Sequence, residues 1–100
     1  PEKKRQLLAE HLLLDALMIL NIIETNEQNA ESKLEDYISN AKVILDEFRE
    51  MARDLGLLDE AKKAEKMKRW LEKMRSNASS DERREWANRM ITTAQSWIFN

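Results

Sequence analysis

The chain has 100 residues with a net charge of −2, one Gly, one Pro and no Cys, and 36% of its residues are charged. Without cysteine the chain has no disulfide framework, thiolate metal site or cysteine nucleophile, and a charge this close to neutral gives no reason to expect nucleic acid as a partner. So little Gly and Pro leaves almost no material for hairpins or phosphate-binding loops. The composition therefore favours one helical domain over residues 1–100, with short connections between its helices.

The first expected helix covers residues 4–24 and is apolar almost all the way round from His11 to Ile23. A membrane span needs about 20 apolar residues, whereas this run is shorter and contains Asp15 and Asn21, so we expect no membrane as a partner. A helix that is apolar on all sides is normally buried. It is either a central helix walled in by the others, or a helix with one face in the core and a second face on a partner.

A projection of this helix favours the second alternative. The line of positions through Leu13 and Leu17 is polar at both ends, which predicts a solvent-facing apolar patch, and such patches often mark interfaces. Two neighbouring lines are expected to lie in the core; they contain Leu7, His11, Leu14 and Met18, and Leu8, Leu12, Ile19 and Ile22 or Ile23. Leu13 and Leu17 are therefore the predicted interface, covered by a partner chain or by a neighbouring segment.

The second expected helix covers residues 30–55. Its apolar residues recur at intervals of three and four, which is the pattern of one buried helical stripe. They are Leu34, Tyr37, Ile38, Ala41, Ile44, Leu45, Phe48, Met51, Ala52 and Leu55. Asn26 or Asn29 is expected to cap its first turn. Gly56 directly follows the last periodic residue and is expected to end the helix in the left-handed conformation.

The third and fourth expected helices cover residues 59–76 and 80–98, each with an apolar stripe of its own. Asp59 is the expected N-cap of the third helix, and Ser79 with Glu82 three residues later forms the capping-box pattern before the fourth. Three short connections between helices of similar length favour antiparallel neighbours. The predicted fold is an all-α, antiparallel up-down-up-down four-helix bundle.

The two middle helices carry opposite excesses of charge. Residues 30–55 contain seven acids and four bases, whereas residues 59–75 contain seven bases and four acids. Neighbouring helices of opposite sign attract, although each exposed ion pair contributes only about 0–1 kcal/mol. We expect these charges to set the register of the two helices more than their stability.

His11 and Asp15 lie four residues apart and therefore on one face of the first helix. A carboxylate beside an imidazole can serve acid–base chemistry or help to hold a metal. The alternative is a partly buried polar pair at the edge of the bundle. The chain has one His and no Cys, and it lacks the Glu-x-x-His motif of di-iron bundles. We therefore expect the structural pair, with no catalytic residue, no metal and no cofactor.

The three tryptophans and a basic run are the other candidates for a binding site. Trp70, Trp86 and Trp97 could form the walls of a pocket for a flat ligand. At their helical spacing they are expected in the core, with the indole N–H turned to the edge, so we expect no small-molecule ligand. The basic run from Lys62 to Arg69 is interleaved with acids, which indicates a solvated face opposite the second helix and no nucleic-acid site.

The segment Leu-Gly-Leu-Leu-Asp-Glu-Ala, which ends at Ala61, resembles the turn between the two helices of a tetratricopeptide repeat. The resemblance covers only this turn, Gly56 to Ala61: the family's later apolar positions fall on Glu65 and Lys68, and no 34-residue period recurs. The whole chain looks like a computationally designed helical bundle, because of its clean stripes, its caps and its Glu, Lys and Arg surfaces. A design assembled from natural helical fragments would also explain the tetratricopeptide-like turn.

The expected function is that of a designed structural scaffold, soluble and with no natural biochemical activity, and therefore not an enzyme. The alternative is a helical protein-interaction or self-association module that uses apolar surface on the first helix. A bundle that binds a ligand or catalyses a reaction with His11, Asp15 and the tryptophans is a third hypothesis. The first two are compatible with a monomer or a homodimer.

Overall fold

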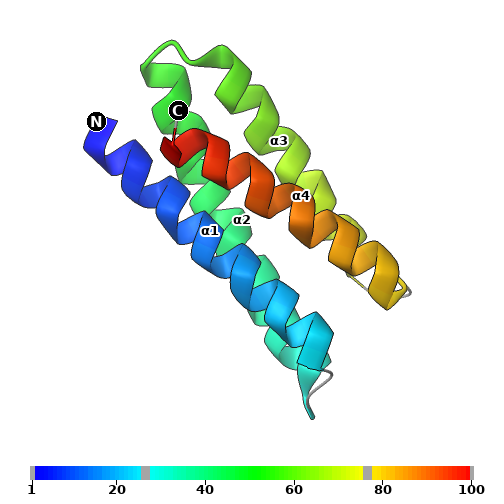
Figure 1. Ribbon diagram of the computed structural model, residues 1–100. Coiled ribbons are helices and arrows are strands. Elements are labelled where there is room, and N and C mark those ends of the chain that lie inside the picture. Colours follow the sequence, from blue (N-terminus) through cyan, green and yellow to red (C-terminus); the bar gives the residue numbers. More distant parts are fainter. Residues whose placement is uncertain (1, 26–27, 76–77, 100) are drawn as a thin grey trace.

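The computed structural model describes residues 2–25, 28–75 and 78–99, which form four helices (Figure 1). The helices are α1 (Glu2–Thr25), α2 (Ala30–Asp54), α3 (Leu58–Lys73) and α4 (Ser80–Phe99). Successive helices run in opposite directions, and the bundle measures 41 × 20 × 19 Å. The predicted antiparallel four-helix bundle is confirmed. The helix ends differ from the predicted ones by at most three residues, the largest difference being at the end of α3.

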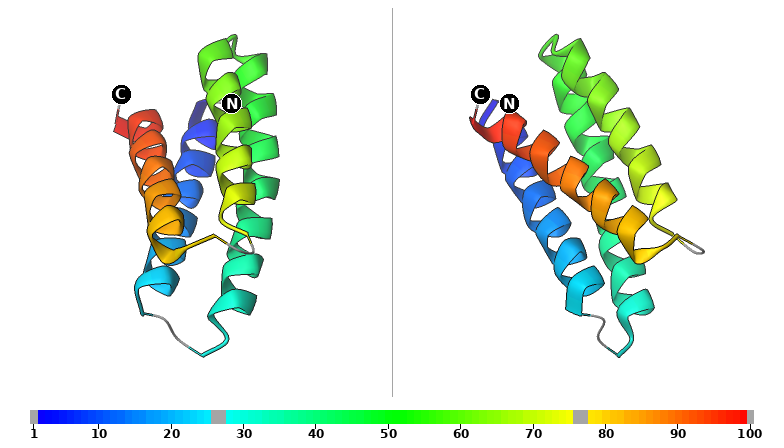
Figure 2. Two further views of the ribbon diagram at one scale, coloured as in Figure 1. Left: turned by 90° about the vertical axis from the view of Figure 1, so that its right-hand side faces the viewer. Right: turned by 45° about the vertical axis from the view of Figure 1, so that its right-hand side comes forward.

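The helices form two layers, α1 with α4 and α2 with α3 (Figure 2). α1 packs against both α4 and α2, and α2 packs against α3, whereas α3 and α4 make the least contact of the four neighbouring pairs. α3 and α4 come together at the connection between them and diverge toward the other end of the bundle. α3 and α4 are therefore the least closely packed of the neighbouring helices.

The core consists of one apolar stripe from each helix. Its largest fully buried side chains are Phe48, Leu12, Ile19, Ile38, Leu45, Met67, Leu71, Met74 and Met90. Between these large residues lie buried alanines, such as Ala16 of α1 and Ala94 of α4. Burial of apolar surface, at roughly 25 cal/mol per Å², is the main force that holds the four helices together.

Gly56 ends α2 in the left-handed conformation, as the sequence predicts, with a φ of +76°. Its amide donates to the carbonyl of Arg53 at 3.0 Å, and the amide of Leu57 donates to the carbonyl of Ala52 at 2.8 Å. This is the Schellman arrangement, which satisfies carbonyl groups that the end of a helix leaves free.

The prediction of Asp59 as the N-cap of α3 is wrong. α3 begins at Leu58, and Leu57 occupies the N-cap position without a side-chain hydrogen bond. The tight turn at Gly56 lets the Leu57 carbonyl accept from the Ala61 amide at 3.1 Å, so the helix has already begun at Asp59. The Asp59 carboxylate instead lies in the first turn, where the helix dipole favours a negative charge.

The two remaining caps differ from each other. Asn29 occupies the N-cap position of α2 with a φ of 67°, but its side chain makes no capping hydrogen bond. Asn26, the alternative cap, lies outside the described residues. In front of α4, the Glu82 amide donates to Ser79 Oγ at 3.1 Å, and the Ser79 hydroxyl lies 3.4 Å from the Glu82 carboxylate. The predicted Ser79 cap is confirmed.

Ion pairs join α2 to α3, as their opposite charges predict. Two pairs have the acid on α2 and two have the base on α2; they are Asp46–Lys68, Glu35–Arg75, Lys42–Glu72 and Arg49–Glu65. Along α2, pairs in which α2 supplies the acid alternate with pairs in which it supplies the base. Sliding one helix by a turn would therefore bring like charges together. The pairs therefore specify the register of α2 and α3, and each contributes little to stability because it is partly exposed.

Candidate functional site

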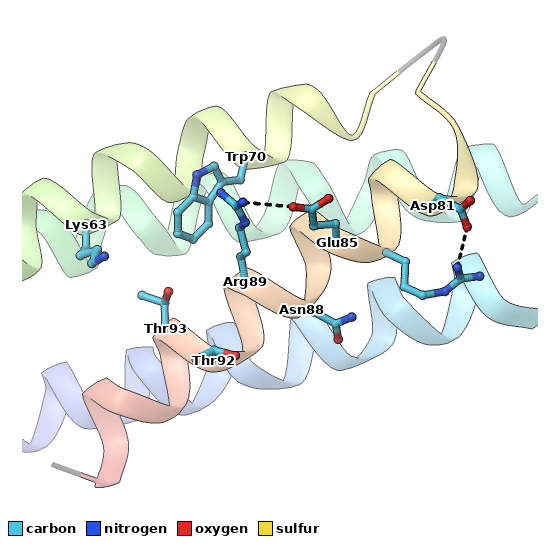
Figure 3. Close-up of a pocket in the computed structure, with 9 residues that line it drawn as sticks. Lys63, Trp70, Asp81, Glu85, Asn88, Arg89, Thr92 and Thr93 are labelled. Carbon is cyan, nitrogen blue, oxygen red and sulfur yellow. Dashed lines mark hydrogen bonds and ion pairs between the residues drawn. The ribbon is translucent and has the colours of Figure 1, made fainter.

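A groove of about 650 Å³ runs along α4 on the side of α3 (Figure 3). Trp70 and Lys63 line it from α3, and the indole of Trp70 descends toward α4 to form an aromatic wall. The remaining lining residues all come from α4; they are Asp81, Arg84, Glu85, Asn88, Arg89, Thr92 and Thr93. The groove therefore follows the line along which α3 and α4 pack least closely.

The carboxylates of this groove are already held by neighbouring arginines. Arg84 donates to Asp81 at 2.9 Å, and Arg89 donates to Glu85 at 3.0 Å. Lys63 makes no ion pair with any residue that the structure describes. The groove is thus open, with one aromatic wall and a lining of polar and charged residues, and both of its acids already accept hydrogen bonds from arginines.

The tryptophans occupy two different environments. Trp97 is buried in the core, whereas Trp70 and Trp86 are half-buried and stack with ring centroids 6.3 Å apart. The Nζ atom of Lys73 and the guanidinium carbon of Arg89 each lie 4.7 Å from the centroid of the Trp86 ring. These are cation–π contacts, so Trp86 is covered by side chains of its own chain, and Trp70 alone of the three lines the groove.

The structure gives His11 and Asp15 opposite environments. His11 is exposed, whereas Asp15 is only 7% exposed, and its Oδ2 atom has no hydrogen-bond partner among the described residues. Burial raises the pKa of Asp15, and the positive charge of a protonated His11 opposes this shift. The described ranges contain no group of three or more His, Asp or Glu side chains placed to hold a metal ion. His11 and Asp15 are therefore an exposed imidazole and a buried carboxyl group that interact through their charges.

The outer face of α1 exposes four large apolar side chains. They are Leu7 (57% exposed), Leu14 (59%), Leu17 (44%) and Met18 (41%), and are referred to below as the α1 outer patch. Of the two predicted interface residues, Leu17 belongs to this patch, whereas Leu13 is partly buried and packs against the core. Large apolar side chains exposed on one helix face in this way are typical of a contact region, and the exposed Glu10 and His11 lie among them.

The prediction that Leu7, His11, Leu14 and Met18 lie in the core is wrong, because all four are exposed. The buried side of α1 is centred instead near Leu12. Successive residues of a helix are turned by about 100°, so Leu14 lies roughly 200° round from Leu12. Because α1 is apolar almost all the way round, its hydrophobic pattern does not indicate which side faces inward.

Two alanines carry the signal that would have identified the inner face. Ala9 and Ala16 of α1 are seven residues apart and fully buried, and α4 has buried alanines at the same spacing, Ala87 and Ala94. Small side chains allow two helix backbones to approach closely, so a repeated alanine marks the side that faces a neighbouring helix. α1 and α4 are indeed the most extensively packed pair.

α1 is the one described helix that is long and apolar enough to cross a membrane, judged by length and composition alone. Its most apolar window of 18 residues has a mean hydropathy of 1.6, and 33% of that window is buried inside the bundle. The core helix of a soluble protein passes the same test. The feature that distinguishes α1 is therefore its apolar outer face.

Comparison with known proteins adds no functional assignment. The sequence matches no protein family and no curated protein. The tetratricopeptide-like turn at Gly56 thus remains a local resemblance. The features of the described structure that bear on function are the α4 groove, the buried Asp15 and the α1 outer patch.

Proposed function

We propose that the chain is a structural scaffold, a computationally designed helical bundle with no natural biochemical activity. The observation that carries this proposal is the use of charged side chains to join helices. Arg83 of α4 donates to both carboxylate oxygens of Glu31 on α2, at 2.7 and 3.2 Å. It also donates to the carbonyl of Met74 at the end of α3, at 2.8 Å. One side chain thereby links three of the four helices.

The same use of charge recurs elsewhere in the bundle. Arg5 of α1 donates to Glu60 of α3 at 2.8 Å, and the four pairs between α2 and α3 set their register. Contacts of this kind disfavour other helix orders and registers, which is what a sequence selected for one fold requires. The carboxylates of the α4 groove, by contrast, pair with arginines of their own helix.

A designed origin is supported by the consistency between local and global features. The Schellman turn at Gly56, the Ser79 cap and the unbroken stripe of α2 each favour the same bundle. The tetratricopeptide-like turn is then a fragment of a natural helical protein that was kept because it joins two antiparallel helices.

A scaffold must reach its folded state without a ligand, and calorimetry tests this. We expect the chain, treated with EDTA, to unfold in one cooperative transition with an enthalpy of about 60–80 kcal/mol, the usual value for this length. The near-ultraviolet circular dichroism of the tryptophans should be fully developed before heating. A chain whose tryptophans become ordered only when a ligand or metal is added would contradict the proposal.

A second function, self-association or protein interaction through α1, is favoured by the α1 outer patch. Sedimentation equilibrium between about 10 µM and 1 mM should detect association through a patch of this size. Leu14→Glu should abolish it, whereas Val43→Glu should not, because Val43 is equally exposed (60%) but lies on α2. A monomer over the whole concentration range would exclude self-association.

A further inference from the structure

The α1 outer patch lies between a basic end and an acidic end. Lys3 and Lys4 precede it and are exposed, and Glu24 follows it with a side chain that is 54% exposed. The apolar part from Leu7 to Met18 covers eleven steps of the helix, or roughly 17 Å. The face therefore runs from a positive end, through a largely apolar part that also exposes Glu10 and His11, to a negative end.

The basic end of this face is unpaired within the described part of the bundle, and the acidic end is only weakly paired. Lys3 and Lys4 make no ion pair with the described part of the chain. The last turn of α1 has no basic residue, although the negative end of a helix dipole favours one. Glu24 lies there instead, and its nearest base, Arg84, is 3.8 Å away. The acidic end of α1 is thus left with one long ion pair, whereas the two lysines at its basic end make none.

We propose that the α1 outer patch binds a second copy of the chain, with the two α1 helices antiparallel about a twofold axis near Leu14. This inference rests on the self-association proposed above and specifies its partner and direction. An antiparallel pair places Lys3 and Lys4 of each copy beside Glu24 and the carbonyl end of α1 in the other. The same surface serves both copies, which is the geometry of an isologous dimer.

A parallel pair would not use these charges. It would place the lysines of one copy against those of the other, and Glu24 against Glu24, at both ends of the contact. It would also align the two helix dipoles, which is unfavourable at close range. The charge pattern therefore distinguishes the two directions, although both cover the same apolar side chains.

A membrane fits this surface less well than a second copy. A bilayer core is about 30 Å thick, whereas the apolar part of the outer face is about half that length and contains Glu10. Insertion of the whole helix would also remove its buried side, including Leu12 and Ile19, from the core. Binding to vesicles is nevertheless a distinct outcome, and co-sedimentation with vesicles would detect it.

The dimer should be weak and reversible. A contact one helix wide buries a few hundred Å² on each copy, which is below the standard size of about 800 Å² per partner. We expect a dissociation constant on the order of 10–100 µM, since interfaces of this size are transient. Raised salt should weaken the dimer further, because its end contacts are exposed ion pairs.

The first experiment reverses the charges at each end. Sedimentation equilibrium should show weaker dimers for Lys3→Glu/Lys4→Glu and for Glu24→Lys, because each change opposes like charges across the twofold axis. The triple variant, with both ends reversed, should recover a dissociation constant within about threefold of the original, since opposite charges again face each other at both ends of the contact. Lys62→Glu/Lys66→Glu is the matched control on exposed positions of α3, and it should leave the constant unchanged.

The second experiment determines the direction of the pair by disulfide formation, for which the chain offers a background without cysteine. In an antiparallel pair centred on Leu14, the two copies of Leu7 lie about 21 Å apart along the axis. A disulfide needs Cα atoms within about 7 Å. In a glutathione redox buffer, Leu14→Cys should therefore cross-link and Leu7→Cys should not.

The outcomes separate the two levels of the proposal. A monomer at all concentrations overturns both self-association and the antiparallel pair. A dimer in which Leu7→Cys cross-links as readily as Leu14→Cys is parallel, which overturns this inference but leaves self-association intact. A monomer that sediments with phosphatidylcholine vesicles would assign the α1 outer patch to a lipid surface instead.

Discussion

Phe48 of α2 stacks on Trp97 of α4 across the core, with ring centroids 4.2 Å apart and the ring planes inclined by 22°. α2 and α4 are diagonal in the bundle, and backbone contact within the described residues is confined to the four neighbouring pairs of helices. Like the Arg83–Glu31 pair, the stack is therefore a side-chain link between two helices whose backbones make no close contact. Aromatic pairs contribute about 0.5–1.5 kcal/mol beyond the burial of their surface.

A double-mutant cycle should measure this link. We expect Phe48→Leu and Trp97→Leu to show a coupling energy of about 0.5–1.5 kcal/mol in urea unfolding. Leucine keeps each position apolar, so the coupling reports the ring contact and not the loss of all side-chain volume. Strictly additive changes in the free energy of unfolding would mean that the rings contribute only through burial.

Substitution of two leucines can test which face of α3 lies in the core. Leu71 is fully buried and Leu58 is 62% exposed. Leu71→Ala should lower the free energy of unfolding by about 2–5 kcal/mol, because it removes buried volume and leaves a cavity. Leu58→Ala should change it by less than about 0.5 kcal/mol, as surface changes do. Similar effects of the two substitutions in thermal or urea unfolding would contradict the packing of α3.

Arg83 should contribute more to stability than the neighbouring arginine. Its side chain is 13% exposed and bonds to Glu31 and to a helix end, whereas Arg84 is 41% exposed. Arg83→Met should lower the free energy of unfolding by about 1.5–3 kcal/mol, the usual range for hydrogen bonds to charged groups. Arg84→Met should lower it by less than about 1 kcal/mol. Equal effects would exclude a special role for Arg83 in joining three helices.

The contribution of Arg83 should also depend on pH. The guanidinium of Arg83 holds the pKa of Glu31 below its usual value of 4.5. A carboxylate with a lowered pKa in the folded state stabilises the fold above its unfolded pKa, and this stabilisation is lost as the pH falls through the folded pKa. The difference in stability between the original chain and Arg83→Met should therefore shrink in acid. A constant difference from neutral pH into acid would contradict the Glu31 pair.

Asp15 should show the opposite dependence on pH. Burial raises its pKa above the usual 3.8, so the folded state binds the proton more tightly than the unfolded state. Stability then falls as the pH rises from 3.8 through the raised value. Asp15→Asn, which resembles the protonated acid, should be more stable than the original chain at neutral pH, with the advantage shrinking toward pH 3 in urea unfolding. A less stable Asp15→Asn at neutral pH would mean that the ionised carboxylate has a partner in solution.

The number, order and direction of the helices could be predicted from sequence because the signals are local. In α2 the apolar residues recur at three and four without a slip, and Gly56 marks the end of the stripe. Cap and turn chemistry acts over a few residues, and so does helical periodicity. These features do not depend on what other helices supply.

The environment of α1 could not be predicted because it depends on the other helices. A helix that is apolar all round has no preferred side until neighbours pack against it, so the exposure of Leu14 and Met18 was missed. The burial of Asp15 was missed for the same reason: its own helix suggests an edge position beside His11, and only the packed bundle encloses it. The α4 groove likewise arises from the divergence of α3 and α4, which no sequence motif specifies.

Substitution of Gly56 separates the effect of backbone conformation from the effect of side-chain packing. Its φ of +76° is a conformation that other residues adopt at a cost, yet a Cβ atom added there would meet no other atom within 4 Å. Gly56→Ala should therefore lower the free energy of unfolding by about 1–2 kcal/mol through backbone strain alone. Gly56→Asn should lower it by less, because asparagine tolerates the left-handed region better. If both variants were as stable as the original in thermal unfolding, the turn would have to relax to a different conformation, and the Schellman bond from Leu57 to Ala52 would not be what ends α2.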